Sequence, residues 1–168
     1  MTSPSAHRSI ESRDAVARFA RAGVATAVTD GLFSSVLSVA AYGSTVARLW
    51  QGVAATVVGA AALNGGARMV SLGLLMHCAV AFTWSGVFVF GAMRSARIRR
   101  MVTARFGVIG VASVYGPAIW MVMSLVVIPA LTRRPTPITF RWWVQFFGHI
   151  PFVGLPIVAS AKRPMKER

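Results

Sequence analysis

The stretch AGVATAVTDGLFSSVLSVAA, residues 22–41, decides the fold of this chain. Twenty residues in an α-helix rise about 30 Å, which matches the hydrocarbon thickness of a bilayer. The stretch contains one carboxylate, Asp30, near its middle. An ionised Asp at that depth costs about 2.5–3.5 kcal/mol on insertion scales, so it has to be neutralised, paired or hydrated. The segment therefore predicts a membrane-spanning helix organised around a buried acid.

Helical spacing gives this segment two unlike faces. Small and hydroxylated residues share the face of the acid: Gly23, Thr26, Ala27, Asp30 and Ser34, with Ser38 at its edge. Branched apolar residues occupy the opposite face: Val28, Leu32, Val36 and Val39. Small residues allow another helix to come close, whereas branched ones suit lipid, so we expect Asp30 to point into a bundle. It would be either a proton or ion site, or an interhelical hydrogen bond that fixes packing.

The whole composition is typical of a membrane protein in one domain, with 55% hydrophobic residues, 13% charged residues and a mean hydropathy of +0.63. A net charge of +14 would indicate nucleic acid in a soluble chain. Here the basic residues cluster between apolar runs. They are better interpreted as topology signals and contacts to anionic lipid, so we expect no nucleic-acid partner. The single cysteine, Cys78, excludes an internal disulfide and a multi-cysteine metal site.

The apolar runs predict an all-α, four-helix transmembrane bundle. The expected spans, with approximate bounds, are 22–41, 68–93, 106–131 and 142–161. Residues 1–21 are expected to be a cytoplasmic tail, disordered at first, with a short interfacial helix from about Ser12. Residues 162–168 are expected to form a basic cytoplasmic tail.

A shorter helix is expected at about 45–63, between the first two spans. Ser44 or Thr45 can cap it, and the turn Asn64-Gly65-Gly66 ends it. Its clean apolar run, from Gly52 to Leu63, is too short to cross a bilayer. We therefore predict a re-entrant or interfacial helix.

Charge predicts the orientation of the four spans. The N-terminal tail, the 94–105 loop and the C-terminal tail would share one side and hold four, five and four basic residues, against five on the other side. The positive-inside rule then places both termini in the cytoplasm of a bacterial cell, with the chain in its inner membrane. If residues 45–63 also crossed, the five-arginine loop would lie outside, against the same rule, so the charge count favours four spans over five. Aromatic residues expected to form a belt at the outer interface are Tyr42, Trp50, Trp142 and Trp143.

Three ionisable residues are expected at a common depth. Counting about 1.5 Å per residue from the span ends puts Asp30, His77 and His149 within roughly 6 Å of one level. Gln145 shares the face of His149, as Thr26 and Ser34 share that of Asp30. Such a cluster can hold a proton, form internal hydrogen bonds, or bind a divalent metal through two imidazoles and a carboxylate. The ordinary alternative is that the two histidines only hydrogen-bond to neighbouring helices, and the metal question stays open.

Enzyme signatures are missing from the sequence. There is no G-x-S-x-G elbow, Walker A sequence, dinucleotide fingerprint or H-E-x-x-H, and four acids leave little material for a paired-carboxylate mechanism. We therefore expect neither an enzyme nor a cofactor.

Scattered motifs resemble a family of small bacterial inner-membrane proteins of unknown function. The residues that carry the resemblance are Asp30, Gln51-Gly52, Gly59, Gly65-Gly66, the run from Gly73 to His77, Tyr115-Gly116, the run from Val126 to Pro129, His149, and the run from Phe152 to Pro156. The resemblance covers about residues 20–163 and implies a four-helix bundle with a short extra helix and equivalents of Asp30, His77 and His149. This chain departs from the family pattern at Ser124, where Met-Asn is usual. The resemblance implies no activity.

Two functional hypotheses follow. The first is a small channel- or transporter-like bundle whose polar pathway contains Asp30, His77 and His149, supported by Thr26, Ser34, Gln145, Ser124 and Tyr115. The second is a structural or accessory membrane subunit in which these residues only specify helix packing. A second copy of the chain or another membrane protein is a compatible partner in either case.

Overall fold

The computed structural model describes residues 4–162, with side chains described from Ser12 onward. This part of the chain forms helices and connecting segments and contains no strand, as expected for an all-α protein. The α-helices are α1 Pro4–Ala40, α2 Val46–Val58, α3 Gly66–Gly86, α4 Ala96–Thr103, α5 Gly107–Val122, α6 Ile128–Thr132, α7 Phe140–His149 and α8 Leu155–Lys162.

Four continuous helical segments within this range are long and apolar enough to cross a membrane. They are Ser12–Ala40, Gly66–Arg94, Gly107–Thr132 and Phe140–Lys162. The last three combine α-helices with π-helical turns, at Val87–Gly91, Met123–Val127 and Ile150–Gly154. The prediction of a four-helix bundle is confirmed to this extent, and the bounds agree with the expected spans to within a few residues, except at the start of the first.

The first helix is longer than expected. Helix α1 runs without a break from Pro4 to Ala40, so the segment before Ala22 continues the first long helix instead of forming a disordered stretch and a separate interfacial helix. Proline is favoured at a first helical position, and residues 5–21 contain no glycine or proline to stop the helix. Each further residue adds a backbone hydrogen bond at little cost once a helix exists.

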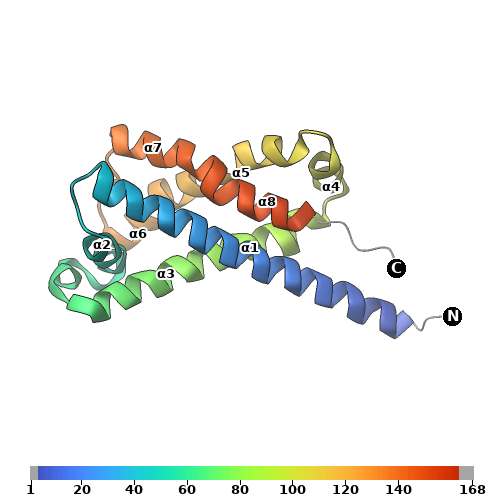
Figure 1. The fold of residues 1–168 in the computed structure, drawn as a ribbon, viewed down its shortest axis with the longest axis horizontal. Helices are drawn as coiled ribbons and strands as arrows, with labels where there is room; N and C mark the ends of the chain where they lie inside the picture. Colours follow the sequence, from blue (N-terminus) through green and yellow to red (C-terminus); the bar gives the residue numbers. More distant parts are fainter. Residues whose placement is uncertain (1–3, 163–168) are drawn as a thin grey trace.

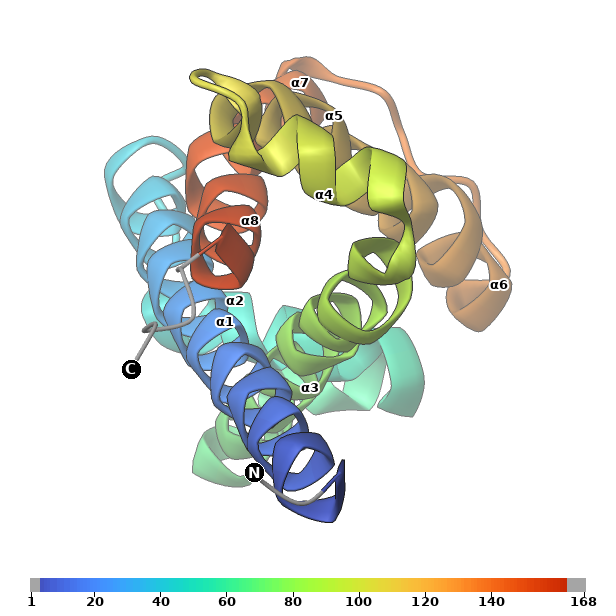
Figure 2. The same cartoon turned by 90° about the vertical axis from the view of Figure 1, so that its right-hand side faces the viewer.

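The long helices alternate in direction, so two ends of the bundle are distinct (Figure 1). Pro4, helix α4 and Lys162 lie at one end, and α2 and the link between α6 and α7 lie at the other. Seen end-on in Figure 2, helices α1, α3, α5 and α8 surround a central axis. Helix α1 packs on α3 and α8, while α5 packs on α7 and α8.

Two short helices lie crosswise at the two ends of the bundle (Figures 1 and 2). Helix α2 is capped by the Thr45 side chain, which accepts the N–H of Arg48, and it ends at Gly59, whose φ of 87° suits glycine. A 3₁₀ turn, Ala60–Asn64, follows, so the expected helix 45–63 is divided in two. Helix α4 was not expected from the sequence, where its residues read as a charged loop.

Helix α4 is amphipathic and connects the ends of α3 and α5 at one side of the bundle (Figure 2). Val102 is fully buried, whereas Arg97 and Arg100 are exposed. The guanidinium of Arg99 donates to the carbonyl oxygens of Met93 and Arg94, which end the preceding span. The apolar cluster at this end joins residues from five segments: Phe88, Val89, Val102, Ala112, Ile119, Val153, Ile157, Val158 and Ala161.

The two faces predicted for the first span are confirmed. Thr26 and Ser38 are buried, and Val28, Leu32, Val36 and Val39 are all at least 50% exposed. The aromatic belt is only partly as expected. Trp143 is exposed, but Trp50 and Trp142 are buried, because Trp50 packs on His77 and the Trp142 Nε1 donates to the Ser124 Oγ at 3.0 Å.

Close helix contacts depend on glycine at a few positions. A Cβ on Gly73 of α3 would lie 1.9 Å from the carbonyl oxygen of Trp50 in α2. A Cβ on Gly116 of α5 would lie 2.1 Å from the carbonyl oxygen of His149. These contacts bring α2 against α3 and α7 against α5, and so hold Trp50 and His149 in place.

Candidate functional site

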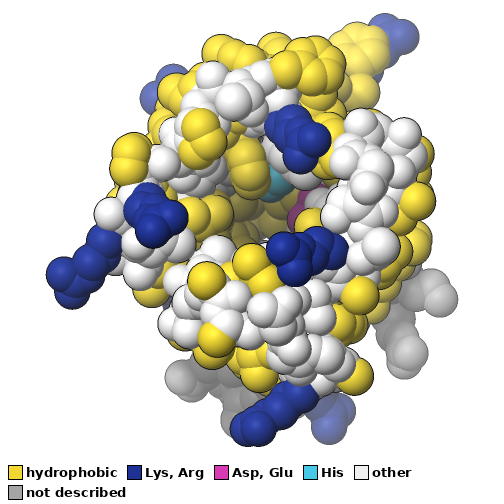
Figure 3. Space-filling model, turned by 90° about the vertical axis from the view of Figure 1, so that its left-hand side faces the viewer, with side chains coloured by type: hydrophobic (Ala, Val, Ile, Leu, Met, Phe, Trp, Pro, Cys, Tyr) yellow, Lys and Arg dark blue, Asp and Glu magenta, His cyan; other side chains and the backbone are white. Residues whose placement is uncertain are grey.

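A cavity of about 380 Å³ lies inside the bundle, between α1, α2, α3, α5, α6 and α7. It is hollowed from the end that carries α2, and both acidic and histidine side chains are visible within it (Figure 3). Lys and Arg side chains surround this opening in Figure 3. The arginines on the elements of this end are Arg48, Arg68, Arg133, Arg134 and Arg141.

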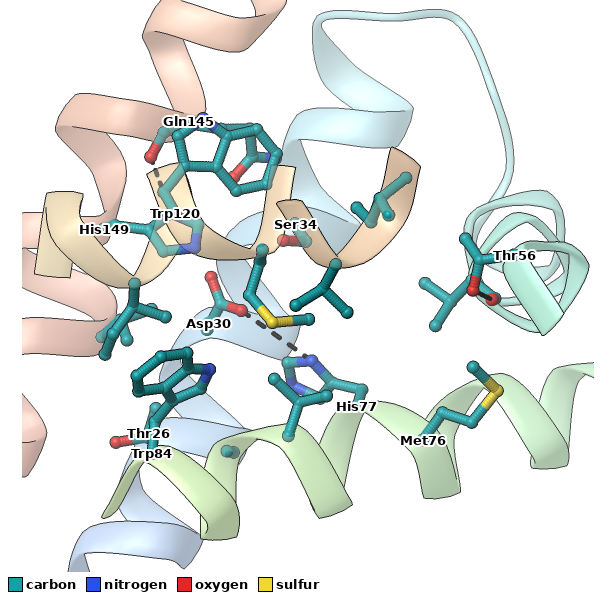
Figure 4. A pocket seen from close by; sticks show the side chains of 18 of the residues that line it. Thr26, Asp30, Ser34, Thr56, Met76, His77, Trp84, Trp120, Gln145 and His149 are labelled. Atoms are coloured by element: carbon teal, nitrogen blue, oxygen red, sulfur yellow. Dashed lines mark hydrogen bonds and ion pairs between the residues drawn. The ribbon is translucent and has the colours of Figure 1, made fainter. Parts of the chain in front are cut away.

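Asp30, His77 and His149, the three residues that the sequence analysis grouped, all line this cavity (Figure 4). They come from α1, α3 and α7 respectively. The Asp30 Oδ2 lies 3.8 Å from the His77 Nδ1, within ion-pair distance but beyond a direct hydrogen bond. In Figure 4 the carboxylate lies between the two imidazole rings.

Backbone contacts fix the tautomer of His77. Its Nε2 lies 3.0 Å from the carbonyl oxygen of Ala27, and because a carbonyl only accepts, Nε2 is the nitrogen that carries the hydrogen. The Nδ1 that faces Asp30 then carries a proton only when the ring is charged. In the neutral ring this nitrogen has a lone pair, which faces the Asp30 carboxyl group.

His149 is held in a similar way. Its Nδ1 donates to the carbonyl oxygen of Gln145 at 2.7 Å, one helical turn earlier. Its Nε2 is then left as the basic nitrogen of the neutral ring. The side chain is 7% exposed. Each histidine thus uses one nitrogen to hold its ring to a helix backbone and keeps the other for a proton.

An indole packs on each imidazole. The ring centroids of Trp50 and His77 are 5.1 Å apart, and those of Trp120 and His149 are 4.9 Å apart. These tryptophans therefore cover the imidazole rings and restrict their orientation.

Three polar atoms of cavity-lining residues are buried and make no hydrogen bond within the described part of the chain. They are the Asp30 Oδ1, the Thr26 Oγ1 and the Trp120 Nε1. A buried polar group without a partner costs about 1–3 kcal/mol, so such groups gathered in one place are typical of a binding site. Between them they offer an acceptor, a hydroxyl and a donor to a bound molecule.

The supporting residues predicted from the sequence divide into two groups. Thr26, Ser34 and Gln145 line the cavity. Tyr115 and Ser124 do not, and for these two the prediction is corrected. The Tyr115 hydroxyl donates to the Trp84 carbonyl at 2.7 Å and so joins α5 to α3.

Ser124 acts in packing, at the π-helical turn of the third span. Its side chain accepts from Trp142, and its carbonyl oxygen accepts from the Thr136 hydroxyl. The carbonyl is free because the Ile128 N–H donates to Met123 and the next residue, Pro129, has no N–H. The small hydroxyl that departs from the family pattern therefore serves the helix contact and not the cavity.

The sequence reasoning missed the tryptophans as members of the site. Trp50, Trp84 and Trp120 all line the cavity. The seven-residue spacing of His77 and Trp84 indicated a shared helix face. Nothing local indicated Trp50 or Trp120, because their position depends on how α2 and α5 pack against the other helices.

A metal site has no support in the part of the chain that the structure describes. No group of three or more His, Cys, Asp or Glu residues there has the geometry to hold a metal ion.

No protein-family model, curated protein or solved structure matches this chain. The resemblance to a family of small inner-membrane proteins therefore stays a prediction.

Proposed function

We propose that this chain is a four-span integral membrane protein of the bacterial inner membrane, and that it acts as a small transporter-like bundle with a proton-binding centre at Asp30, His77 and His149. One observation carries the proposal. A carboxylate lies between two imidazoles in a cavity that is open at one end, and each ring is tied to a backbone carbonyl so that its other nitrogen is available to a proton.

The surface of the bundle supports the membrane location. Large apolar side chains are exposed along all four long helices, among them Leu32, Leu75, Val114 and Phe147. In water this surface would be an aggregation hazard, whereas in lipid it is the expected exterior. The crosswise helices α2 and α4 then lie at the two membrane surfaces.

The charge distribution supports cytoplasmic termini. In the sequence, residues 1–21, 94–105 and 162–168 hold thirteen basic residues, and the segments that connect the other ends of the spans hold five. By the positive-inside rule the end with Pro4, α4 and Lys162 faces the cytoplasm, where anionic lipid headgroups also attract it. The cavity then opens toward the outer side of the membrane.

The packing of the bundle favours a transporter over an open channel. The cavity opens at the α2 end (Figure 3), while the apolar cluster that includes Phe88, Val102 and Ile157 packs together the helices that meet at the α4 end. Access from one side at a time is the arrangement that a carrier requires. A proton taken up by Asp30 and His77 would therefore be released to the other side only after that cluster opens.

The test uses proteoliposomes and an infrared measurement. Purified protein is reconstituted with a pH-sensitive dye inside the vesicles, and proton entry is followed after a pH jump. In parallel, the carbonyl stretch of a protonated carboxyl group is followed by infrared difference spectroscopy during titration. We expect Asp30→Asn to remove both the band and the pH-dependent flux while the thermal unfolding temperature stays close to that of the wild type.

Asp14→Asn is the matched control, because it makes the same chemical change on the same helix outside the cavity. It should leave the band and the flux unchanged. If the wild type shows neither signal and Asp30→Asn lowers only stability, the protein is a structural or accessory subunit and the proposal fails.

A further inference from the structure

The chemistry of the cavity wall indicates what kind of molecule it accepts. Among the described residues that line it, most are apolar, three are tryptophans, and Asp30 is the only acid. No lysine or arginine lines the cavity. Figure 4 shows the Trp120 and Trp84 side chains on either side of Asp30 in the view. This combination of indoles and a single carboxylate is how proteins recognise organic cations.

We propose that the cavity binds a small organic cation with an apolar body, such as an aromatic quaternary ammonium, with Asp30 as its counter-ion. This inference rests on the proposed function, because it gives the same carboxylate two alternative partners: a proton or the cation. The buried Asp30 Oδ1 has no hydrogen-bond partner in the described residues and is available to face the charge of the cation.

The size of the cavity fits such a molecule. Pockets for small molecules have volumes of about 300–1,000 Å³ and are mostly apolar, with a few polar groups that orient the ligand. A cavity of about 380 Å³ accommodates one aromatic ring with a trimethylammonium group. An apolar body is required because most of the cavity wall is apolar, with Val53, Val80 and Ile119 among its residues.

Binding of the cation should release a proton. In the part of the chain that the structure describes, the only other titratable side chains that line the cavity are His77 from α3 and His149 from α7, since α2, α5 and α6 contribute none to its lining. A cation beside Asp30 favours the ionised carboxylate and the uncharged His77. A proton held by either group is then lost to the solvent, so one cation enters for up to one proton released. Binding should be tighter at higher pH.

The arginines around the opening repel a cation, whereas Asp30 inside the cavity attracts it. Their positive charge lowers the concentration of cations near the opening, and salt screens this effect over about 10 Å at 0.1 M. The enclosed attraction to Asp30 is screened much less. The association rate of the cation should therefore rise with salt, in contrast to a site that attracts its ligand through exposed acids.

The test compares two ligands of the same shape on the unchanged protein. Phenyltrimethylammonium and its uncharged isostere tert-butylbenzene are titrated into the full chain in detergent, with calorimetry and tryptophan fluorescence as readouts, at pH 6 and pH 8. We expect the cation to bind at least about tenfold more tightly than the isostere, and more tightly at pH 8 than at pH 6. Proton release in weakly buffered solution should accompany binding of the cation alone.

Variants then assign the site. Asp30→Asn should weaken binding of the cation at least about tenfold and leave the isostere unaffected. Trp84→Leu should weaken cation binding severalfold, whereas Trp143→Leu is the matched control, because Trp143 is exposed and does not line the cavity.

Three results would overturn the inference, and a fourth would separate it from the proposed function. Equal affinity for the cation and its isostere would show a merely apolar cavity. Tighter binding of benzoate than of the cation would show an anion site governed by the arginines. Absence of cation binding together with an Asp30-dependent proton flux would remove the inference and leave the proposed function standing. Cation binding without any proton release or flux would support the cation site and remove the proton-linked function.

Discussion

Threonine hydroxyls compensate for proline residues at two points in this fold. Pro156 has no N–H for the carbonyl of Phe152, four residues earlier, and the Thr29 hydroxyl of α1 lies 2.6 Å from that oxygen. Thr136 does the same for the carbonyl of Ser124. In a lipid environment a free carbonyl has no water to bind, so these hydroxyls supply the hydrogen-bond donors that the two carbonyl oxygens would otherwise lack.

Thr29→Val should therefore destabilise the protein by about 1 kcal/mol, because it leaves the Phe152 carbonyl without a donor. Thermal unfolding in detergent measures the effect. Thr83→Val is the matched control: its hydroxyl bonds only to Ala79 of its own helix and is exposed, so its effect should be close to zero. Equal effects of the two changes would contradict this role of Thr29.

Replacing Pro156 tests whether the Thr29 hydroxyl compensates for its missing N–H. In a Pro156→Ala background, residue 156 regains an N–H and can donate to Phe152 itself. The cost of Thr29→Val should then fall to less than half of its value in the wild type. A double-mutant cycle measures this coupling directly, and additive effects of the two changes would show that Thr29 and Pro156 act independently.

Among the helices, α2 is the element that completes the wall of the cavity. It lies across the end of the bundle, packs most closely on α3 and contributes Trp50 and Leu49 to the cavity wall. The close approach depends on Gly73, because any side chain there would meet the α2 backbone. The position of Trp50 over His77 is thus a property of a helix contact.

Gly73→Ala should cost about 1–3 kcal/mol of stability, because the new methyl group overlaps the Trp50 carbonyl and forces α2 away from α3. The fluorescence of Trp50 should change with it. Gly52→Ala on α2 is the control, since a Cβ there meets nothing within 4 Å and alanine favours a helix. A neutral Gly73→Ala would mean that α2 is not held in this position.

At the level of the whole molecule, the two ends differ in charge and in access to the cavity. The proposed orientation places Arg100 of α4 in the cytoplasm and Arg133, in the link after α6, outside. Both residues are exposed. Single cysteines at these positions report the orientation once the native Cys78 has been replaced by alanine.

In intact cells a membrane-impermeant maleimide should label Arg133→Cys and not Arg100→Cys. Both should react after the cells are opened, which controls for folding and accessibility. Labelling of Arg100→Cys alone in intact cells would reverse the orientation. Labelling of both variants in intact cells would contradict a protein that places these two residues on opposite sides of the membrane.

The sequence by itself determined the helical class, the four long apolar segments, the inward face of the first helix and the placement of Asp30, His77 and His149 on three of these segments. These follow from local rules: hydropathy sets the length of a span, the 3.6-residue period sets its faces, and the rise per residue sets depth. Each rule needs only neighbours in the chain.

Only the tertiary structure decided which nitrogen of each histidine faces Asp30, that Trp50 and Trp120 cover the rings, and that Tyr115 and Ser124 lie outside the cavity. These features depend on how far each helix is rotated and displaced against the others. Glycine contacts between helices and carbonyls freed by prolines set those rotations, and both couple residues far apart in the chain. Periodicity along one helix contains no such information.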